Sequence, residues 1–182
     1  MRRTKNAPHK ACIYGITKLA SDFMGKTLAT DLGIEFNVAI IGSCFGPGDN
    51  SERIHNTVIY KLLKGERPIL INGDTLHDSI YIDDAVRMFL ALGMYSVNMR
   101  NYYLGHRNLR RLEEIVTDVR DELNPGVSLR FGEIQSSFKI DYSLVDLDAL
   151  FRDTGCVAES DFKDSIRVTA DWIKKARKYE TK

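Results

Sequence analysis

Apolar residues recur along most of the chain, either at every third or fourth position or in short β-branched runs. The first spacing places side chains on one face of a helix, and the second is typical of strands. A long helix is predicted from Cys12 to Leu32, with Gly33 placed where a C-terminal cap is expected. The run from Phe36 to Ile41 is β-branched and bounded by glycines, which predicts a buried strand.

The rest of the chain continues this alternation of helices and short strands, which indicates an α/β fold. A loop rich in Gly, Pro, Asp and Asn is expected at 42–51. Asp83 or Asp84, Asp146 and Asp161 are expected to cap helices. Further helices are predicted at 54–64, 83–94, 112–123, 146–155 and 161–179, and further strands at 68–71, 79–82, 102–104 and 127–131.

Composition places the 182-residue chain among ordinary globular proteins, since 43% of residues are hydrophobic and 28% are charged. A formal net charge of +1 gives no electrostatic reason to expect nucleic acid or a membrane surface as a partner. No apolar run approaches the roughly 20 residues that span a bilayer. The three cysteines and four histidines are scattered, which predicts no disulfide framework and no metal site. We expect a cytoplasmic protein with buried thiols.

Tyr14 and Lys18 carry the clearest candidate chemistry. Residues four apart on a helix lie about 40° apart around its axis, so both side chains share one face. A nearby ammonium group lowers the pKa of a phenol, and a tyrosine can then take a proton from a substrate hydroxyl. Alternatively, the pair belongs to an ordinary solvated helix face, where Tyr and Lys often occur at this spacing by chance.

Further motifs give this pair a context. Tyr14-Gly15-Ile16-Thr17-Lys18 resembles the Tyr-Gly-x-x-Lys motif of extended short-chain dehydrogenases, a family that includes nucleotide-sugar epimerases and dehydratases. The order and spacing of the other motifs, from about Pro8 to about Trp172, extend the resemblance over nearly the whole chain. They are Ser43-Cys44-Phe45-Gly46-Pro47-Gly48-Asp49, Gly73-Asp74-Thr75, His77-Asp78, Tyr81-Ile82-Asp83-Asp84, Asn101-Tyr102-Tyr103-Leu104-Gly105, Asp153-Thr154-Gly155 and Ala170-Asp171-Trp172.

The resemblance implies a partial Rossmann-type fold, with the later strands and helices of a doubly wound sheet and a small C-terminal substrate-binding region. Residues 1–182 are then one compact unit, with 8–66 belonging to the dinucleotide-binding part and 67–182 mostly to the substrate-binding part. It implies NAD or NADP as cofactor and a nucleotide-sugar as substrate. Tyr14 and Lys18 would be catalytic and contact the cofactor, together with Ile41 and Ser43. Ser43, His77 and Arg107 would bind the substrate.

Two departures from the family pattern qualify these expectations. No glycine-rich strand-turn-helix, which holds the pyrophosphate in that family, precedes Tyr14 in this sequence. Ile40 and His77 stand where the family has arginines, whose planar fork suits phosphate oxygens. We therefore expect a truncated enzyme that is inactive alone. The alternatives are a non-catalytic remnant and half of a split enzyme. The partner would be another copy or a complementing N-terminal half.

Other motifs also keep two interpretations. The loop 45–49 is either a tight turn that needs Gly and Pro or a cover over cofactor and sugar. His77-Asp78 either orders a turn or presents His77 to a substrate phosphate. Arg107 lies either in a solvated turn or at the substrate rim.

Overall fold

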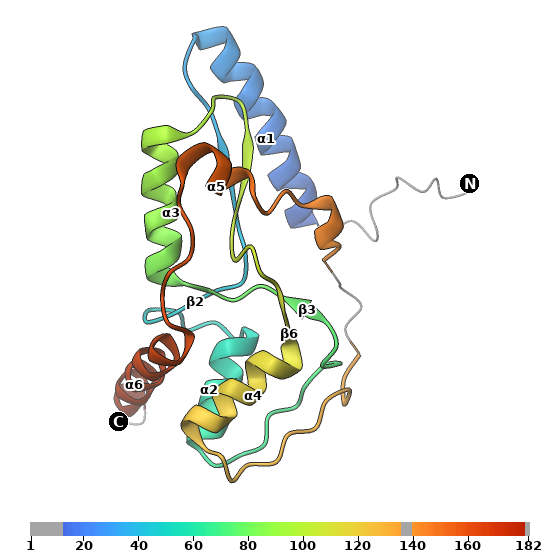
Figure 1. Cartoon of the computed structure of the whole chain (residues 1–182), viewed down its shortest axis with the longest axis vertical. Coiled ribbons are helices and arrows are strands. Elements are labelled where there is room, and N and C mark those ends of the chain that lie inside the picture. The colour runs from blue at the N-terminus through green and yellow to red at the C-terminus, as the bar shows by residue number, and fades with distance from the viewer. Residues whose placement is uncertain (1–12, 136–139, 181–182) are drawn as a thin grey trace, which may run out of the picture. The chain divides into compact units, whose positions relative to one another are not determined.

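The computed structural model describes residues 13–135 and 140–180, and it alternates helices with short strands as the sequence predicts (Figure 1). The predicted start of the first helix at Cys12 lies outside the described residues. The helices are α1 (Ile13–Leu32), α2 (Ile54–Leu63), α3 (Ile82–Tyr95), α4 (Leu112–Leu123), the short 3-10 helix η1 (Tyr142–Leu144), α5 (Ala149–Thr154) and α6 (Phe162–Glu180). The strands are β1 (Val38–Ile41), β2 (Cys44–Phe45), β3 (Leu76–His77), β4 (Ile80–Tyr81), β5 (Asn101–Leu104) and β6 (Arg110–Arg111).

The chain divides into two units by its internal contacts. The first comprises Met1–Val38 with Val97–Asn101, and the second comprises Ala39–Ser96 with Tyr102–Lys182. The predicted assignment of 8–66 to cofactor binding and 67–182 to substrate binding concerns ligand roles, and it stays a prediction.

The first unit is built on α1, which ends at Gly33 with a φ of +66°, as a C-terminal glycine cap requires. Phe36 packs against Gly25, where an added Cβ would lie 2.4 Å from the phenyl ring. The apolar spacing of α1 predicts a helix face packed against a core. The structure differs, since Ala29 is the one buried residue of α1. Its other large apolar residues are exposed: Ile16, Leu19, Phe23, Met24 and Leu28.

Three two-stranded sheets replace the longer strands that the sequence suggests: β1 with β5, β2 with β4, and β3 with β6. The β2–β4 pair is parallel and the β3–β6 pair is antiparallel. β1 is only partly buried, which corrects the prediction of a buried strand at 36–41. Residues 68–71 and 127–131 form no strand, because the neighbouring backbone bonds, such as Gly132 N–H to Ile71 C=O, are isolated and build no ladder.

Two hydrophobic clusters form the core of the second unit. The first joins α2, α4 and α6, which pack against one another (Figure 1), and includes Phe45 from β2. The second joins α3 and α5 with β4 and β5, and its fully buried members include Ile80 and Tyr102. β2 therefore supplies Phe45 to the first cluster, and β4 supplies Ile80 to the second.

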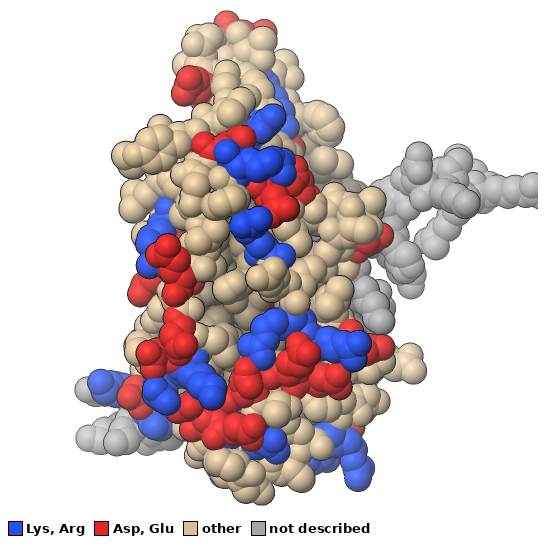
Figure 2. Space-filling view, in the orientation of Figure 1, with Lys and Arg blue, Asp and Glu red and all other residues tan. Residues whose placement is uncertain are grey.

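Charged side chains of both signs lie intermixed over the face that Figure 2 shows, including the region of α2 and α4. Ion pairs of 2.5–2.6 Å account for part of this mixture, including Lys61–Glu66 and Arg110–Asp118. Exposed pairs of this kind contribute little to stability individually. The pattern agrees with the nearly balanced net charge.

Three helices were predicted to begin with an aspartate cap, and the structure shows such a cap in one of the three cases. Asp161 accepts a hydrogen bond from Asp164 N–H at 2.9 Å, as a helix cap does. Asp146 instead accepts from Asp148 N–H in the turn before α5, which has no side-chain cap. Neither Asp83 nor Asp84 caps α3, because its N-cap residue is Tyr81 and no side chain makes the cap hydrogen bond.

Asp84 instead ties the C-terminal segment to α3. Its carboxyl is fully buried and accepts hydrogen bonds from Glu159 N–H at 3.0 Å and Ser160 N–H at 3.3 Å. It also pairs with the half-exposed guanidinium of Arg87. One carboxylate thus satisfies two backbone donors of a loop that is about 75 residues away along the chain.

We predict that Asp84→Ala lowers the free energy of unfolding by about 2 to 4 kcal/mol, because two backbone donors lose their acceptor. Asp83→Ala is the matched control. Asp83 is exposed in the first turn of α3, so its loss should cost less than about 1 kcal/mol. Urea denaturation of both variants measures the difference, and equal losses would contradict the role given to Asp84.

Candidate functional site

The carboxyl ends of β1 and β5 form the edge where polar candidate residues gather. Gly42 N–H donates to Leu104 C=O at 2.9 Å, so the two strand ends lie side by side. Ser43 follows β1 after one residue, and Arg107 follows β5 after two residues. In open α/β sheets, ligands bind at the carboxyl ends of the strands. This edge is therefore the candidate ligand site of the second unit.

His77 joins the same edge through its neighbour Asp78. Ser43 C=O accepts from Ile80 N–H at 3.1 Å, and Asp78 accepts from His106 N–H at 2.9 Å. These bonds bring together the backbone segments that carry Ser43, His77 and Arg107. The sequence predicted all three as substrate contacts, and the structure supports their proximity while their roles stay predictions.

The Arg107 side chain is already engaged within the second unit. Its Nε lies 2.5 Å from Asp148 Oδ1, and its guanidinium stacks over the Phe151 ring at 4.3 Å. A cleft of about 400 Å³ adjoins it, lined by His106, Arg107, Asn108, Asp148, Val157 and Ala158. The ion pair holds Arg107 at the rim of this cleft while leaving it partly exposed.

His77 belongs to a cluster of aromatic side chains. His55 Nε2 and the Ser79 hydroxyl lie 2.7 Å apart, and His77 Nδ1 lies 3.4 Å from the same hydroxyl. His55 also stacks on Phe45 with ring centroids 4.7 Å apart. Burial, together with electrostatic interaction with the neighbouring His77, lowers the pKa of His55 from 6.5 to about 3. Burial lowers the pKa of His77 as well.

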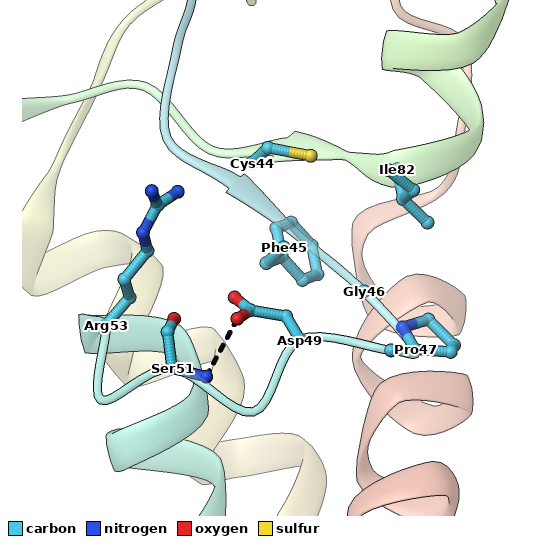
Figure 3. Close-up of a pocket in the computed structure, with 9 residues that line it drawn as sticks. Cys44, Phe45, Gly46, Pro47, Asp49, Ser51, Arg53 and Ile82 are labelled. Atoms are coloured by element: carbon cyan, nitrogen blue, oxygen red, sulfur yellow. Dashed lines mark hydrogen bonds between the residues drawn. The ribbon is translucent and has the colours of Figure 1, made fainter.

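A second cavity, of about 460 Å³, lies beside the loop that follows β2 (Figure 3). Gly46 and Pro47 run past Ile82 at the start of α3, and Asp49 then turns the chain toward Arg53. Asp49 accepts from Ser51 N–H at 2.9 Å, and this bond with those from Ser51 and Asn56 side chains lowers the pKa of Asp49 despite its partial burial. The loop therefore has its own internal order.

Tyr14 and Lys18 belong to the first unit. Lys18 Nζ lies 5.5 Å from the centroid of the Tyr14 ring, which confirms that the two residues share one face of α1. Both side chains are exposed, and Tyr14 retains 67% of its accessible surface. Ile41, the last residue of β1, is 47% exposed. The catalytic and cofactor roles of these residues stay predictions.

The sequence does not predict the burial of two side chains of the second unit, His55 and Asp78. Nothing in the sequence separates His55 from the other scattered histidines, although it is 4% exposed and its Nδ1 has no hydrogen-bond partner among the described residues. Asp78 belongs to the His77-Asp78 motif, which the sequence interprets as a turn or as a pair that presents His77 to a phosphate. Neither interpretation identifies Asp78 as a buried carboxyl.

Within residues 13–135 and 140–180, no three His, Cys, Asp or Glu side chains converge as metal ligands would. The described helices include none that is both long and apolar enough to cross a bilayer. Cys44 and Cys156 are free thiols that are partly exposed, rather than buried as expected.

Helices that alternate with short strands, with parallel pairing between β2 and β4, define an α/β protein. Residues 3–105 match the model of the NAD dependent epimerase/dehydratase family. This match covers more than half of the chain, so the protein belongs to that family.

Relatives and solved structures agree with this assignment. The chain is 24% identical over 169 residues to dTDP-glucose 4,6-dehydratase of Shigella flexneri, covering 87% of this chain and 46% of the relative. It is equally identical to a probable dTDP-glucose 4,6-dehydratase of Sinorhizobium fredii, covering 48% of that relative. The chain thus spans about half the length of the curated relatives it matches.

Among solved structures, Bordetella bronchiseptica WbmF in complex with NADH superimposes with a TM-score of 0.79 at 17% identity, covering 98% of this chain and 56% of WbmF. A UDP-glucuronic acid 4-epimerase from Bacillus cereus, in complex with UDP-glucuronic acid and NAD, superimposes with a TM-score of 0.73 at 15% identity. The superposition covers 97% of this chain and 58% of the epimerase. These likenesses confirm the Rossmann-type fold of the extended short-chain dehydrogenases.

The lowered pKa of His55 predicts an acid-sensitive fold. A buried neutral histidine stabilises the protein fully above its unfolded pKa of 6.5, and this contribution is lost as pH falls toward about 3. His55→Gln keeps a side chain that can bond Ser79 but cannot become charged, so it should flatten the loss of stability over this range. Denaturant midpoints at pH 7, 5 and 4 test this, with His106→Gln, at a partly exposed site, as control. A parallel pH profile in the parent and His55→Gln would contradict the assignment.

Proposed function

We propose that this chain is the Tyr-Lys and substrate-side part of an NAD(P)-dependent nucleotide-sugar epimerase or dehydratase. The observation that carries the proposal is the family match over residues 3–105, which includes both the Tyr14–Lys18 pair and the strand ends beside Ser43 and Gly105. Relatives named as dTDP-glucose 4,6-dehydratases and a structural neighbour named with UDP-glucuronic acid support a nucleotide-sugar as the substrate class.

The candidate residues would have different roles in the chemistry. Tyr14 would remove the proton from a sugar hydroxyl, because its phenol stands exposed beside an ammonium group. The edge formed by Ser43, His77 and Arg107 would bind the nucleotide-sugar. Burial lowers the pKa of His77 and Arg107 is paired with Asp148, so hydrogen bonds would contribute more than free positive charge.

The cofactor fits the described residues in part. The exposed face of Tyr14 and Lys18 offers a hydroxyl and an ammonium group to the ribose of a nicotinamide cofactor. When bound, the cofactor supplies the acceptor for the hydride that leaves the sugar carbon. No glycine-rich turn opening a helix, the usual holder of the pyrophosphate, occurs among the described residues.

The exposed apolar stripe of α1 favours a second candidate function, in which the chain acts by binding a partner. Phe23 and Met24 retain 63% and 71% of their accessible surface. Contiguous apolar surface of this kind is characteristic of interaction sites. The chain would then be a non-catalytic remnant or half of a split enzyme, with a second copy or a complementing N-terminal half as its partner.

We predict that the chain alone binds NAD with a dissociation constant weaker than about 1 μM, which corresponds to about −8 kcal/mol. The physical reason is the lack of a pyrophosphate-holding turn within the described residues. Calorimetric titration measures the constant, and NADP serves as the comparison ligand. Micromolar or tighter binding of either would contradict the expectation.

A second prediction concerns the protein supplemented with the glycine-rich half of a relative, fused upstream or added as a separate chain. Tyr14→Phe should reduce turnover by about 10²- to 10⁴-fold, the usual effect of removing a positioned base. Lys18→Ala should also reduce turnover and weaken cofactor binding. The matched control is Tyr95→Phe, at another exposed tyrosine. Turnover by Tyr14→Phe at the parent rate would remove the catalytic assignment.

A further inference from the structure

Asp78 lies at the base of the candidate ligand edge and is 0% exposed. Its Oδ1 accepts the hydrogen bond from His106 N–H, and its own segment continues into β4. No lysine or arginine among the described residues pairs with it. The titratable groups that face it are the Tyr103 and Tyr142 phenols, the His106 imidazole and the Cys44 thiol. The carboxyl is therefore buried without a cation within hydrogen-bonding distance.

Two glycines make this burial possible. A Cβ added to Gly42 would lie 1.9 Å from Asp78 Oδ2, and one added to Gly105 would lie 2.1 Å from the same atom. Neither glycine has a positive φ, so the reason for glycine at both positions is space for the carboxyl rather than backbone freedom. Oδ2 thus fills the gap between the chain segments that leave β1 and β5.

Oδ2 and the Tyr103 hydroxyl are both buried, and neither completes a hydrogen bond of good geometry with any described residue. They are nevertheless close enough to influence each other. Burial raises the pKa of Asp78, and the hydrogen bond from His106 N–H and the nearby Tyr103 phenol offset this only in part. An ionised Asp78 would be a buried charge without a partner cation, which is costly. An uncharged carboxylic acid has an O–H that a small rotation could direct to the Tyr103 oxygen.

We propose that Asp78 is a positioning residue that remains an uncharged carboxylic acid and fixes the spacing of the three segments that carry Ser43, His77 and Arg107. It bonds the segment of Arg107 through His106, packs against the segment of Ser43 through Gly42, and adjoins His77 directly. Being uncharged, it adds no negative charge beneath an edge that would receive phosphates. This last consequence rests on the proposed function.

The test compares Asp78→Asn with Asp78→Ala, and uses the exposed Asp83→Asn as control. An amide reproduces the neutral acid, because its oxygen can accept from His106 and its NH₂ can donate to Tyr103. Amide hydrogen exchange should therefore change by less than about 2-fold at His106 in Asp78→Asn. It should accelerate by about 10-fold or more in Asp78→Ala, where a buried donor loses its acceptor.

The pH profile separates an uncharged positioning acid from a structural carboxylate. The folded-state pKa of Asp78 is raised above 3.8, so its stabilising contribution is present below 3.8 and is lost as pH rises through the folded-state value. Asp78→Asn should therefore gain stability relative to the parent as pH increases above 4. If Asp78→Asn is less stable than the parent at pH 7, or fails to fold there, the proposal is overturned.

Calorimetric titration with UDP tests the link to the proposed function. Affinity should be equal in the parent and Asp78→Asn, and about 10-fold weaker in Asp78→Ala, if the positioned edge binds the nucleotide. Binding unaffected by Asp78→Ala would show that the edge does not depend on Asp78. If the parent binds no UDP, the proposed function fails for this chain, and the exchange and pH data still decide the role of Asp78.

Discussion

The parallel pairing of β2 with β4 is the constraint on which the second unit depends. Although each strand has only two residues, Cys44 aligns with Ile80 and Phe45 with Tyr81. Phe45 is buried in the cluster of α2, α4 and α6, whereas Ile80 is buried in the cluster of α3, α5 and β5. The pair therefore connects two cores, and no other strand pair in the described part of the chain supplies fully buried residues to both. Because the candidate ligand segments adjoin these strands, the cores also determine where the polar residues lie.

The electrostatic character of the ligand edge follows from this burial. Burial lowers the pKa of His55 and of the partly buried His77, and Arg107 is paired with Asp148. His77 stands where the family pattern has an arginine, so a permanent cation is replaced by a neutral ring that bonds through Ser79. If ligands bind at this edge as proposed, hydrogen-bond geometry would discriminate among them more than total charge.

The sequence predicted the helices well because their signals are local. The bounds of α4 and the glycines that end α1 and α5 follow from periodicity and capping alone. The strands were predicted less well, since a run such as 68–71 becomes a strand only if a partner ladder exists, and periodicity does not reveal partners. The same limit explains why the sequence did not predict the structural roles of Asp78 and Asp84. Their importance comes from hydrogen bonds to His106 and Glu159, which lie 28 and 75 residues away along the chain.

The residues behind the family resemblance divide into two physical kinds. Asp78, Asp84 and Gly105 are buried, and packing or backbone hydrogen bonds within this chain are enough to explain them. Their match therefore supports the fold and says little about chemistry. Tyr14 and Lys18 differ, because both are exposed on α1 and neither fills a core. A motif pair that the fold itself does not require is better explained by what it binds, and this makes α1 the element on which a catalytic role must be tested.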